Sequence, residues 1–312
     1  MASAPAHAPA PSDPDTYGPQ TPSPWLEVDW REHLRWVTVR GRRANVMEIG
    51  EGPPLLLVHG HSGCWQNWLE NVPHFARTHR VVAPDLPGFG YSDMPADGVS
   101  IEGYARFLDA LCDELGIEST PVVGNSLGGF VGAELCLKFP ERSSRLALVS
   151  AAGLADRYIG LPASVLRRKS VAGFARATNA YARLPDARLE TLVRRPRLRR
   201  AVLRMVAAHP DRLPAPMCAE LLRGSGRPAA PDATDALVTY DFRDRLGDVR
   251  CPTLIVWGDR DRTVPVQGAE EYERLIPNAR KVIMRDTGHV PMVERPAQFN
   301  ALLEEFLAEE GR

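Results

Sequence analysis

The segment Gly124-Asn125-Ser126-Leu127-Gly128-Gly129 decides the fold of this chain. It follows the apolar pair Val122-Val123 and opens a stretch of helical periodicity, so it predicts a sharp turn from a buried strand into a helix. A serine on such a turn has strained backbone angles, and the residues two positions away from it must be small. Glycine at positions 124 and 128 meets that need. The first amides of the helix offer N–H groups and a positive dipole end to negative charge, so the segment predicts a nucleophilic serine.

Short apolar runs that end at turn residues recur along the chain. They occupy residues 34–39, 46–49, 55–58, 81–83, 122–123, 146–149, 254–257 and 282–284. Continuous apolar runs such as 55–58 are typical of strands buried on both faces, whereas polar residues interrupt the segments at 34–39 and 46–49. Helical periodicity lies between them, for example at residues 101–115, 127–139 and 268–275. Strands that alternate with helices predict an α/β fold with a mostly parallel, helix-covered sheet.

The alternation stops between residues 154 and 237, where proline interrupts a series of helical segments. Residues 154–235 hold 16 Lys and Arg against 7 Asp and Glu, although the whole chain has a net charge of −1. We interpret 154–237 as a helical insertion into a core domain formed by 25–153 and 238–312. The tail at 1–24 is rich in Ala and Pro, lacks the features of a secretory signal or transit peptide, and is predicted to be disordered.

The composition excludes several classes of protein. With 44% hydrophobic and 25% charged residues the chain is typical of a globular protein. A net charge of −1 provides no field that would recruit nucleic acid, and no apolar run approaches the about 18 residues that a membrane-spanning helix needs. The five cysteines are scattered and form no CxxC pair, so we predict neither a disulfide framework nor a zinc site, and we expect a cytoplasmic protein.

A serine hydroxyl is a weak nucleophile unless a base takes its proton. Gly288-His289 follows one of the buried runs, and a loop at that end of a strand reaches the sheet edge where Ser126 is expected. The histidine in turn needs an acid that holds its tautomer. Asp259 and Asp261 both follow another buried run; we favour Asp261 as the acid and Asp259 as a turn cap, and the reverse assignment stays open.

The loop after the third strand, residues 59–63, reads His-Gly-His-Ser-Gly. The backbone amide of His61 is predicted to join that of Leu127 in an oxyanion hole, in which one donor contributes about 3 kcal/mol to transition-state stabilisation. Two alternatives remain: His61 acts through its side chain, or His59 acts as a base. We favour a structural hydrogen bond for His59, because it ends a buried strand.

Three further features bear on the substrate. Trp65, three residues before Trp68, is a candidate for lining the acyl pocket, with core packing as the alternative. Cys64 lies near the predicted oxyanion hole without an obvious base and is interpreted as a packing residue. The arginine run at 194–200 is either a solvated helix face or an anion site.

Together these motifs resemble the α/β-hydrolase superfamily, in its ester-hydrolase and meta-cleavage-hydrolase branch. The matching segments, in family order from about residue 35 to 308 outside the insertion, are His59-Gly60, residues 85–92 (DLPGFGYS), residues 124–129, Gly258-Asp259-Arg260-Asp261, and Gly288-His289 with Glu294-Arg295-Pro296. The resemblance implies an eight-stranded sheet with Ser126 as nucleophile, Asp261 as acid and His289 as base. It also implies that 154–237 is a helical lid over the active site.

Departures from individual relatives narrow the chemistry that the resemblance implies. Epoxide hydrolases and haloalkane dehalogenases have an aspartate where this chain has Ser126. Carbon–carbon bond hydrolases typically have tryptophan after the catalytic histidine, where this chain has Val290, and a longer glycine-rich oxyanion loop. Proline iminopeptidases usually have tryptophan where this chain has Leu127.

We therefore predict a serine hydrolase that cleaves a small-to-medium carboxylic ester or lactone through an acyl-enzyme, without metal or organic cofactor. The expected partner is a small-molecule acyl substrate. Three alternatives stay open: hydrolysis of a carbon–carbon bond in a vinylogous diketone, acyl transfer to an alcohol or thiol, and a ligand receptor that retains the three catalytic side chains. The sequence carries no signature of the oligomeric state.

Overall fold

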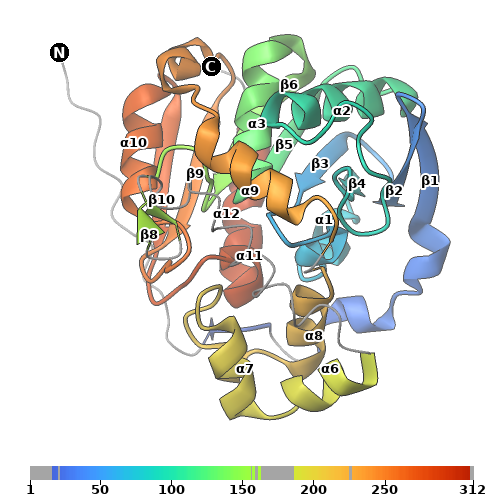
Figure 1. Cartoon of the computed structure of the whole chain (residues 1–312), viewed down its shortest axis with the longest axis vertical. Coiled ribbons are helices and arrows are strands. Elements are labelled where there is room, and N and C mark those ends of the chain that lie inside the picture. The colour runs from blue at the N-terminus through green and yellow to red at the C-terminus, as the bar shows by residue number, and fades with distance from the viewer. Residues whose placement is uncertain are drawn as a thin grey trace.

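A computed structural model of the chain describes residues 16–19, 22–155, 157–158, 161–162, 186–224 and 227–309. At its centre lies an eight-stranded sheet with the order β1-β2-β4-β3-β5-β6-β9-β10 (Figure 1). The strands are β1 (Leu34–Val39), β2 (Arg42–Ile49), β3 (Pro54–Val58), β4 (Arg80–Pro84), β5 (Thr120–Asn125), β6 (Ser143–Val149), β9 (Thr253–Gly258) and β10 (Ala279–Met284). Strand β2 runs antiparallel to the other seven strands, so the predicted mostly parallel sheet is confirmed.

The apolar runs form strands because both faces of the sheet are covered. Successive side chains of a strand point to opposite faces, and in β3 Leu55 and Leu57 belong to one core while Leu56 and Val58 belong to the other. The first core is closed by α1 (Val72–Phe75) and α12 (Pro296–Ala308), and the second by α2 (Ile101–Glu114), α3 (Leu127–Lys138) and α10 (Gln267–Leu275). The three predicted helices end within one residue of the observed ones.

Helix α2 shows how the local sequence sets an element. Ser100 precedes it in an extended conformation, and its hydroxyl oxygen accepts a hydrogen bond from the amide of Gly103 at 3.0 Å. Such a cap satisfies one of the amides that the first turn leaves unpaired and contributes about 1 kcal/mol. The buried residues follow the helical period. They are Ile101, Tyr104, Ala105, Phe107, Leu108, Leu111 and Cys112.

Between β6 and β9 the chain leaves the sheet. Its described elements there are the short strands β7 (Arg157–Tyr158) and β8 (Leu161–Pro162) and the helices α6 (Asp186–Val193), α7 (Pro196–Leu203), α8 (Ala215–Arg223) and α9 (Ala230–Thr239). The two-residue pair β7–β8 differs from the purely helical insertion that we expected. Helices α6, α7 and α8 gather at one end of the molecule, whereas α9 crosses in front of the sheet (Figure 1). The expected boundary at 237 falls inside α9.

The expected disordered tail of residues 1–24 is too long. Tyr17 is only 7% exposed and Ser23 only 4%. The hydroxyl of Ser23 donates to the Glu70 carboxylate at 3.0 Å. The Ala- and Pro-rich composition concealed these contacts, because the partners Glu294 and Glu70 are distant in the sequence. Residues 1–15 and 20–21 lie outside the described residues.

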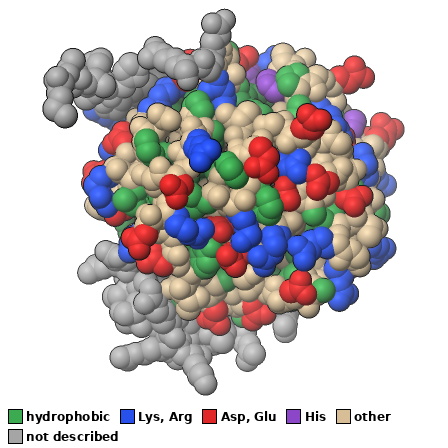
Figure 2. Space-filling view, turned by 90° about the horizontal axis from the view of Figure 1, so that it is seen from above, with side chains coloured by type: hydrophobic (Ala, Val, Ile, Leu, Met, Phe, Trp, Pro, Cys, Tyr) green, Lys and Arg blue, Asp and Glu red, His purple; other side chains and the backbone are tan. Residues whose placement is uncertain are grey.

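The surface carries both signs of charge. On the face seen in Figure 2, Lys and Arg side chains alternate with Asp and Glu, and hydrophobic side chains are scattered between them. This mixture fits the net charge of −1. Among the helices of the described residues, none has the length and apolar character needed to cross a membrane.

Candidate active site

Ser126 occupies the turn between β5 and α3. Its backbone has φ 55° and ψ −115°, a combination that non-glycine residues rarely adopt. The neighbouring strand helps to hold this strained conformation, because the amide of Ser126 donates to the carbonyl of Val149 at 2.9 Å. Its side chain is nearly buried, with the residue 6% exposed. The geometry matches the strand-to-helix turn that the sequence predicted.

Glycines around this turn allow backbones to approach closely. A Cβ built on Gly124 would lie 2.2 Å from the carbonyl oxygen of Gly128, and one on Gly128 would lie 2.2 Å from that of Val58. A Cβ on Gly60 would lie 3.1 Å from the Cβ of Ser126. The loop at 60–63 therefore lies directly beside the serine.

Gly124→Ala is expected to destabilise the protein by at least about 3 kcal/mol, because the added methyl meets rigid backbone and no flexible side chain. Gly132→Ala is the matched control in α3. Its Cβ would meet only the side-chain ends of Leu146 and Val122 at 3.3 Å, and the higher helix propensity of alanine offsets the crowding, so the change stays within about 1 kcal/mol. Urea unfolding of both variants checks this; equal stability would contradict the packing described.

His289 and Asp261 form a buried pair at the same edge of the sheet. Nδ1 of His289 lies 2.7 Å from Oδ2 of Asp261, and their side chains are 7% and 0% exposed. The other carboxylate oxygen accepts from the amides of Thr263 and Val264 at 2.8 and 2.9 Å, which fixes its orientation. Because Nδ1 must donate to the carboxylate, Nε2 of the neutral ring keeps its lone pair and can accept a proton.

Asp259, the alternative acid, lies elsewhere. Its carboxylate accepts a hydrogen bond from the amide of Thr287, in the loop after β10, at 3.3 Å; this contact joins two loops and differs from the cap of its own turn that the sequence suggested. The serine turn and the histidine loop are joined by Asn125, whose side-chain amide donates to the carbonyls of Val149 and His289, each at 3.1 Å. The residue next to Ser126 thus contacts the backbone of His289.

Of the two predicted oxyanion donors, Leu127 follows Ser126 directly, and His61 follows Gly60, on which a Cβ would lie 3.1 Å from that of Ser126. Leu127 is the first residue of α3, where helix amides have no partner within the helix. The ring of His61 is held by other groups: Nε2 lies 2.8 Å from the carbonyl of Ala230, and Nδ1 lies 2.8 Å from the Ser62 hydroxyl. Burial lowers the pKa of His61. These contacts favour a role for its backbone amide over a role for its side chain.

His59 is a structural residue. It is fully buried, Nε2 accepts from the amide of Leu86 at 2.9 Å, and Nδ1 lies 2.8 Å from the carbonyl of Gly60. The two contacts together require a neutral ring that donates through Nδ1. Burial also lowers the pKa of His59. Neither ring nitrogen is left to act as a base.

The tryptophans that follow lie in the core beneath the insertion. Trp68 is fully buried and packs against Phe299, with ring centroids 6.3 Å apart. Trp65 is 3% exposed, and its indole Nε1 has no hydrogen-bond partner among the described residues. Contact of Trp65 with substrate stays a prediction. Burial raises the pKa of the Cys64 thiol, which agrees with a packing role.

The arginine run at 194–200 contains both a buried side chain and exposed ones. Arg199 is 8% exposed and donates to the carbonyls of Val193 and Asp211, each at 2.8 Å, so it stabilises the insertion. Its neighbours Arg197 and Arg200 are exposed on α7. An anion site there stays a prediction. In the described part of the chain, no three His, Cys, Asp or Glu side chains come together as metal ligands would.

The insertion packs on the loop at residues 60–63 and on the loop that carries His289. A Cβ on Gly224 would lie 2.9 Å from the carbonyl oxygen of Ser62, and one on Gly288 would lie 2.7 Å from the amide nitrogen of Ala208. The backbone amide of His289 donates to the carbonyl of Val206 at 2.8 Å. A lid function for the insertion remains a proposal, and these contacts support it.

The sequence analysis did not name two buried residues near the site as site residues. They are Asn125, inside the quoted segment, and Glu294, which belongs to the Glu-Arg-Pro segment. The only signal in the sequence was a polar residue among apolar neighbours. Burial of a single polar residue produces no periodic pattern, so the sequence could not show that these two side chains are buried.

Comparison with known proteins agrees with this geometry. The family model for the alpha/beta hydrolase fold matches residues 53–296. A 2-hydroxymuconate semialdehyde hydrolase of Pseudomonas putida is 31% identical over 292 residues, which cover 88% of this chain and 94% of that protein.

Two solved structures are similar at 27% identity. A membrane phospholipase A has a TM-score of 0.70 and matches 91% of this chain and 90% of its own. An N-acyl homoserine lactone degrading enzyme has a TM-score of 0.68 and matches 87% of this chain and 100% of its own. From the family match, the sheet order and these relatives together, we conclude that the chain belongs to the α/β-hydrolase family.

Proposed function

We propose that the protein is a serine hydrolase that cleaves a carboxylic ester or lactone through an acyl-enzyme. The observation that carries the proposal is the buried His289–Asp261 pair, 2.7 Å apart, together with Asn125, the neighbour of the strained Ser126, whose side-chain amide donates to the carbonyl of His289 at 3.1 Å. The oxygen of Ser126 attacks the substrate carbonyl while its proton passes to Nε2 of His289. Asp261 stabilises the imidazolium that forms.

The second half of the cycle uses the same groups. The tetrahedral oxyanion is stabilised by the backbone amides of Leu127 and His61, and it collapses as the imidazolium gives its proton to the leaving oxygen. Water then attacks the acyl-enzyme and transfers a proton to His289. The second tetrahedral intermediate collapses as the imidazolium gives that proton to the oxygen of Ser126, and the carboxylic acid is released. Each step exchanges one proton with His289, so the enzyme ends each cycle in its starting state.

The substrate class follows from the surroundings of the site and from similar proteins. Leu221 and Leu222 of α8 belong to the same buried apolar cluster as Trp65, and a Cβ on Gly224, which follows α8, would lie 2.9 Å from the carbonyl oxygen of Ser62, so these apolar side chains support a pocket for an apolar acyl group. The two solved relatives at 27% identity are, by their names, a phospholipase and a lactone-degrading enzyme. We propose a small-to-medium acyl group on an oxygen leaving group.

Carbon–carbon bond hydrolysis is the second candidate. The relative at 31% identity is named as a 2-hydroxymuconate semialdehyde hydrolase, and another of that name in a Pseudomonas strain is 30% identical. Against this candidate stands Val290, a buried residue at the position after His289 where carbon–carbon bond hydrolases typically have tryptophan.

A substrate panel separates the two candidates. Wild-type protein is assayed with nitrophenyl esters of two to twelve carbons, with a series of lactones and with a vinylogous diketone acid. We expect kcat/KM to be at least about tenfold higher on the best ester or lactone than on the diketone acid. Turnover of the diketone acid with little on any ester would establish the second candidate instead, and no turnover on any of them would contradict both.

A further inference from the structure

Residues 16–18 cross the loop that carries His289, and we call them the N-terminal strap. The amide of Gly18 donates to the carbonyl of Glu294 at 2.6 Å, and the guanidinium of Arg295 donates to the hydroxyl of Thr16 at 3.3 Å. The strap thus contacts the chain a few residues beyond His289, although more than 270 residues separate the two in sequence.

The carboxylate of Glu294 organises the histidine loop. It is fully buried and accepts hydrogen bonds from the amides of Gly288 at 2.9 Å and Val290 at 3.2 Å, the residues on either side of His289. It also accepts from the amide of Ala208 in the insertion, at 2.8 Å. Because the amide of His289 itself bonds to the insertion, three consecutive amides of this loop are fixed.

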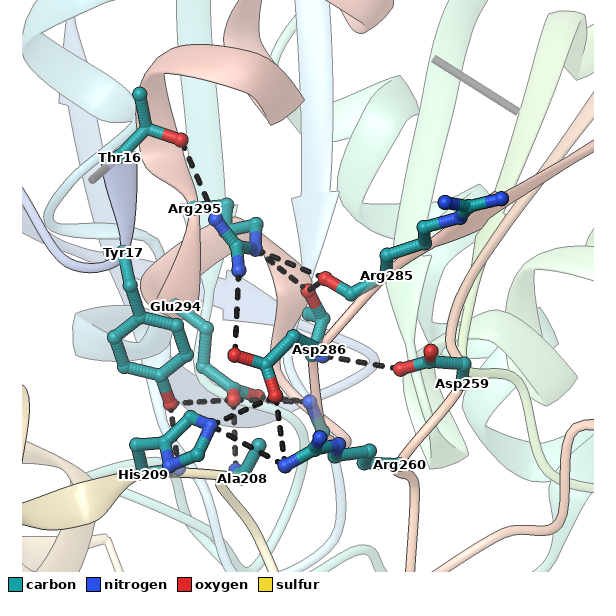
Figure 3. A network of polar contacts seen from close by, with 12 residues as sticks. Thr16, Tyr17, Ala208, His209, Asp259, Arg260, Arg285, Asp286, Glu294 and Arg295 are labelled. Atoms are coloured by element: carbon teal, nitrogen blue, oxygen red, sulfur yellow. Dashed lines mark hydrogen bonds and ion pairs between the residues drawn. The ribbon is translucent and has the colours of Figure 1, made fainter. Parts of the chain in front are cut away.

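Tyr17 completes the environment of this carboxylate. Its hydroxyl donates to Oε2 of Glu294 at 2.6 Å and accepts from the amide of His209 at 2.9 Å (Figure 3). Burial and the charge of Glu294 raise the pKa of Tyr17, so the phenol keeps the proton that it donates. Burial raises the pKa of Glu294, while the hydrogen bonds from Tyr17 and the surrounding amides act in the opposite direction.

The ring of Tyr17 is clamped from several sides. The guanidinium of Arg212 lies 4.9 Å from the ring centroid, and that of Arg295 lies 5.3 Å from it. The ring of His209 meets it edge-on, with centroids 5.2 Å apart. Cation–π and edge-to-face contacts of this kind hold an aromatic ring in one orientation. The hydroxyl therefore stays directed at Glu294.

The network extends toward the catalytic acid. Oδ1 of Asp286 lies 2.8 Å from Nε2 of His209 and 2.8 Å from Nη1 of Arg260 (Figure 3). Arg260 is the residue before Asp261. The insertion, the histidine loop and the acid loop are thus connected in one cluster, and the strap supplies the tyrosine at its buried side.

We propose that Tyr17, acting through Glu294, is a positioning residue for His289: it fixes the loop that carries the imidazole and joins it to the insertion segment 206–209. The inference rests on the proposed role of His289 as the base. A proton transfer requires the acceptor within a few tenths of an ångström of its position, and a misplacement of about 1 Å caused by a distant change can lower the rate about 100-fold. The strap limits that misplacement.

Tyr17→Phe tests this inference, because it keeps the ring and its contacts and removes only the hydroxyl. We expect kcat on an activated ester to fall on the order of tenfold, with KM changed by less than about twofold, and the rate of inactivation by a fluorophosphonate to fall in parallel. Glu294→Gln, which places an amide group among amide donors, is expected to lower kcat further.

Ser23→Ala is the matched control. It too removes a hydroxyl that donates to a buried carboxylate from the N-terminal segment, but that carboxylate is Glu70, outside the histidine loop. Both variants are assayed well below the melting temperature, with near-UV circular dichroism as a check on folding. A similar loss of melting temperature is expected, with kcat of Ser23→Ala within about twofold of wild type.

These experiments distinguish a failure of the role inferred for Tyr17 from a failure of the proposed function. If kcat of Tyr17→Phe equals that of Ser23→Ala, Tyr17 is merely structural and the inference is wrong. If wild-type protein itself does not react with the fluorophosphonate at Ser126, the proposed function is wrong. A selective loss of kcat in Tyr17→Phe, in a protein that is labelled at Ser126, supports both.

Discussion

Ser126→Ala is expected to lower kcat on a nitrophenyl ester on the order of 10⁵-fold, because the variant lacks the oxygen that forms the acyl-enzyme. The residual rate would come from the oxyanion donors and from substrate binding. The fold should persist, since the backbone of residue 126 is held by the Val149 carbonyl and not by its hydroxyl. Steady-state assays at saturating ester, with circular dichroism for the fold, check the result.

Ser144→Ala is the control for this experiment. Ser144 is exposed near the start of β6, whereas Ser126 follows the end of the parallel strand β5, at the opposite edge of the sheet. Its kcat should stay within about twofold of wild type. If Ser126→Ala retained a rate comparable to that of Ser144→Ala, the protein would cleave esters without the serine, and the proposed mechanism would be wrong.

Asp261→Asn is expected to lower kcat by about 10³- to 10⁴-fold. An amide at this position offers N–H where His289 Nδ1 needs an acceptor, which favours the ring tautomer with its proton on Nε2, and it removes the charge that stabilises the imidazolium. The remaining carbonyl oxygen can still accept from Thr263 and Val264, so the loop should keep its shape.

Asp259→Asn is the matched comparison, since it makes the same chemical change two residues away. Its carbonyl oxygen can still accept from Thr287, and we expect kcat within about threefold of wild type. Assays of both variants on one ester decide the assignment. A large loss in Asp259→Asn with little loss in Asp261→Asn would show that the sequence-based preference, and the pairing in the structure, name the wrong acid.

Much of the core fold was predictable because its determinants are local. The runs at 55–58 and 254–257 are apolar throughout because both faces of a parallel sheet are covered, and helix α2 was predicted from its apolar period. Glycine is required at positions 124 and 128 because a Cβ there would collide with neighbouring backbone. These two glycines therefore allowed the serine turn to be predicted from the sequence.

Other features depend on contacts between distant segments and leave no local pattern. Nothing around Tyr17 indicates that its hydroxyl meets Glu294, 277 positions away. The choice between Asp259 and Asp261 depends on which carboxylate faces His289. Both residues lie in one loop with similar neighbours in the sequence, so the sequence does not show how their side chains are oriented. The described helices of the insertion were foreseen, but their placement over Ser62 and Gly288 required the structure.

The central claim is that Ser126 is the nucleophile that His289 and Asp261 activate. Wild-type protein is incubated with a fluorophosphonate, and the adduct is located by peptide mass spectrometry. The account predicts one adduct per chain, on the peptide that contains Ser126 and on that serine, with labelling slowed by at least about 100-fold in Asp261→Asn. An adduct on another residue, or none at all under conditions in which the protein turns over esters, would contradict it.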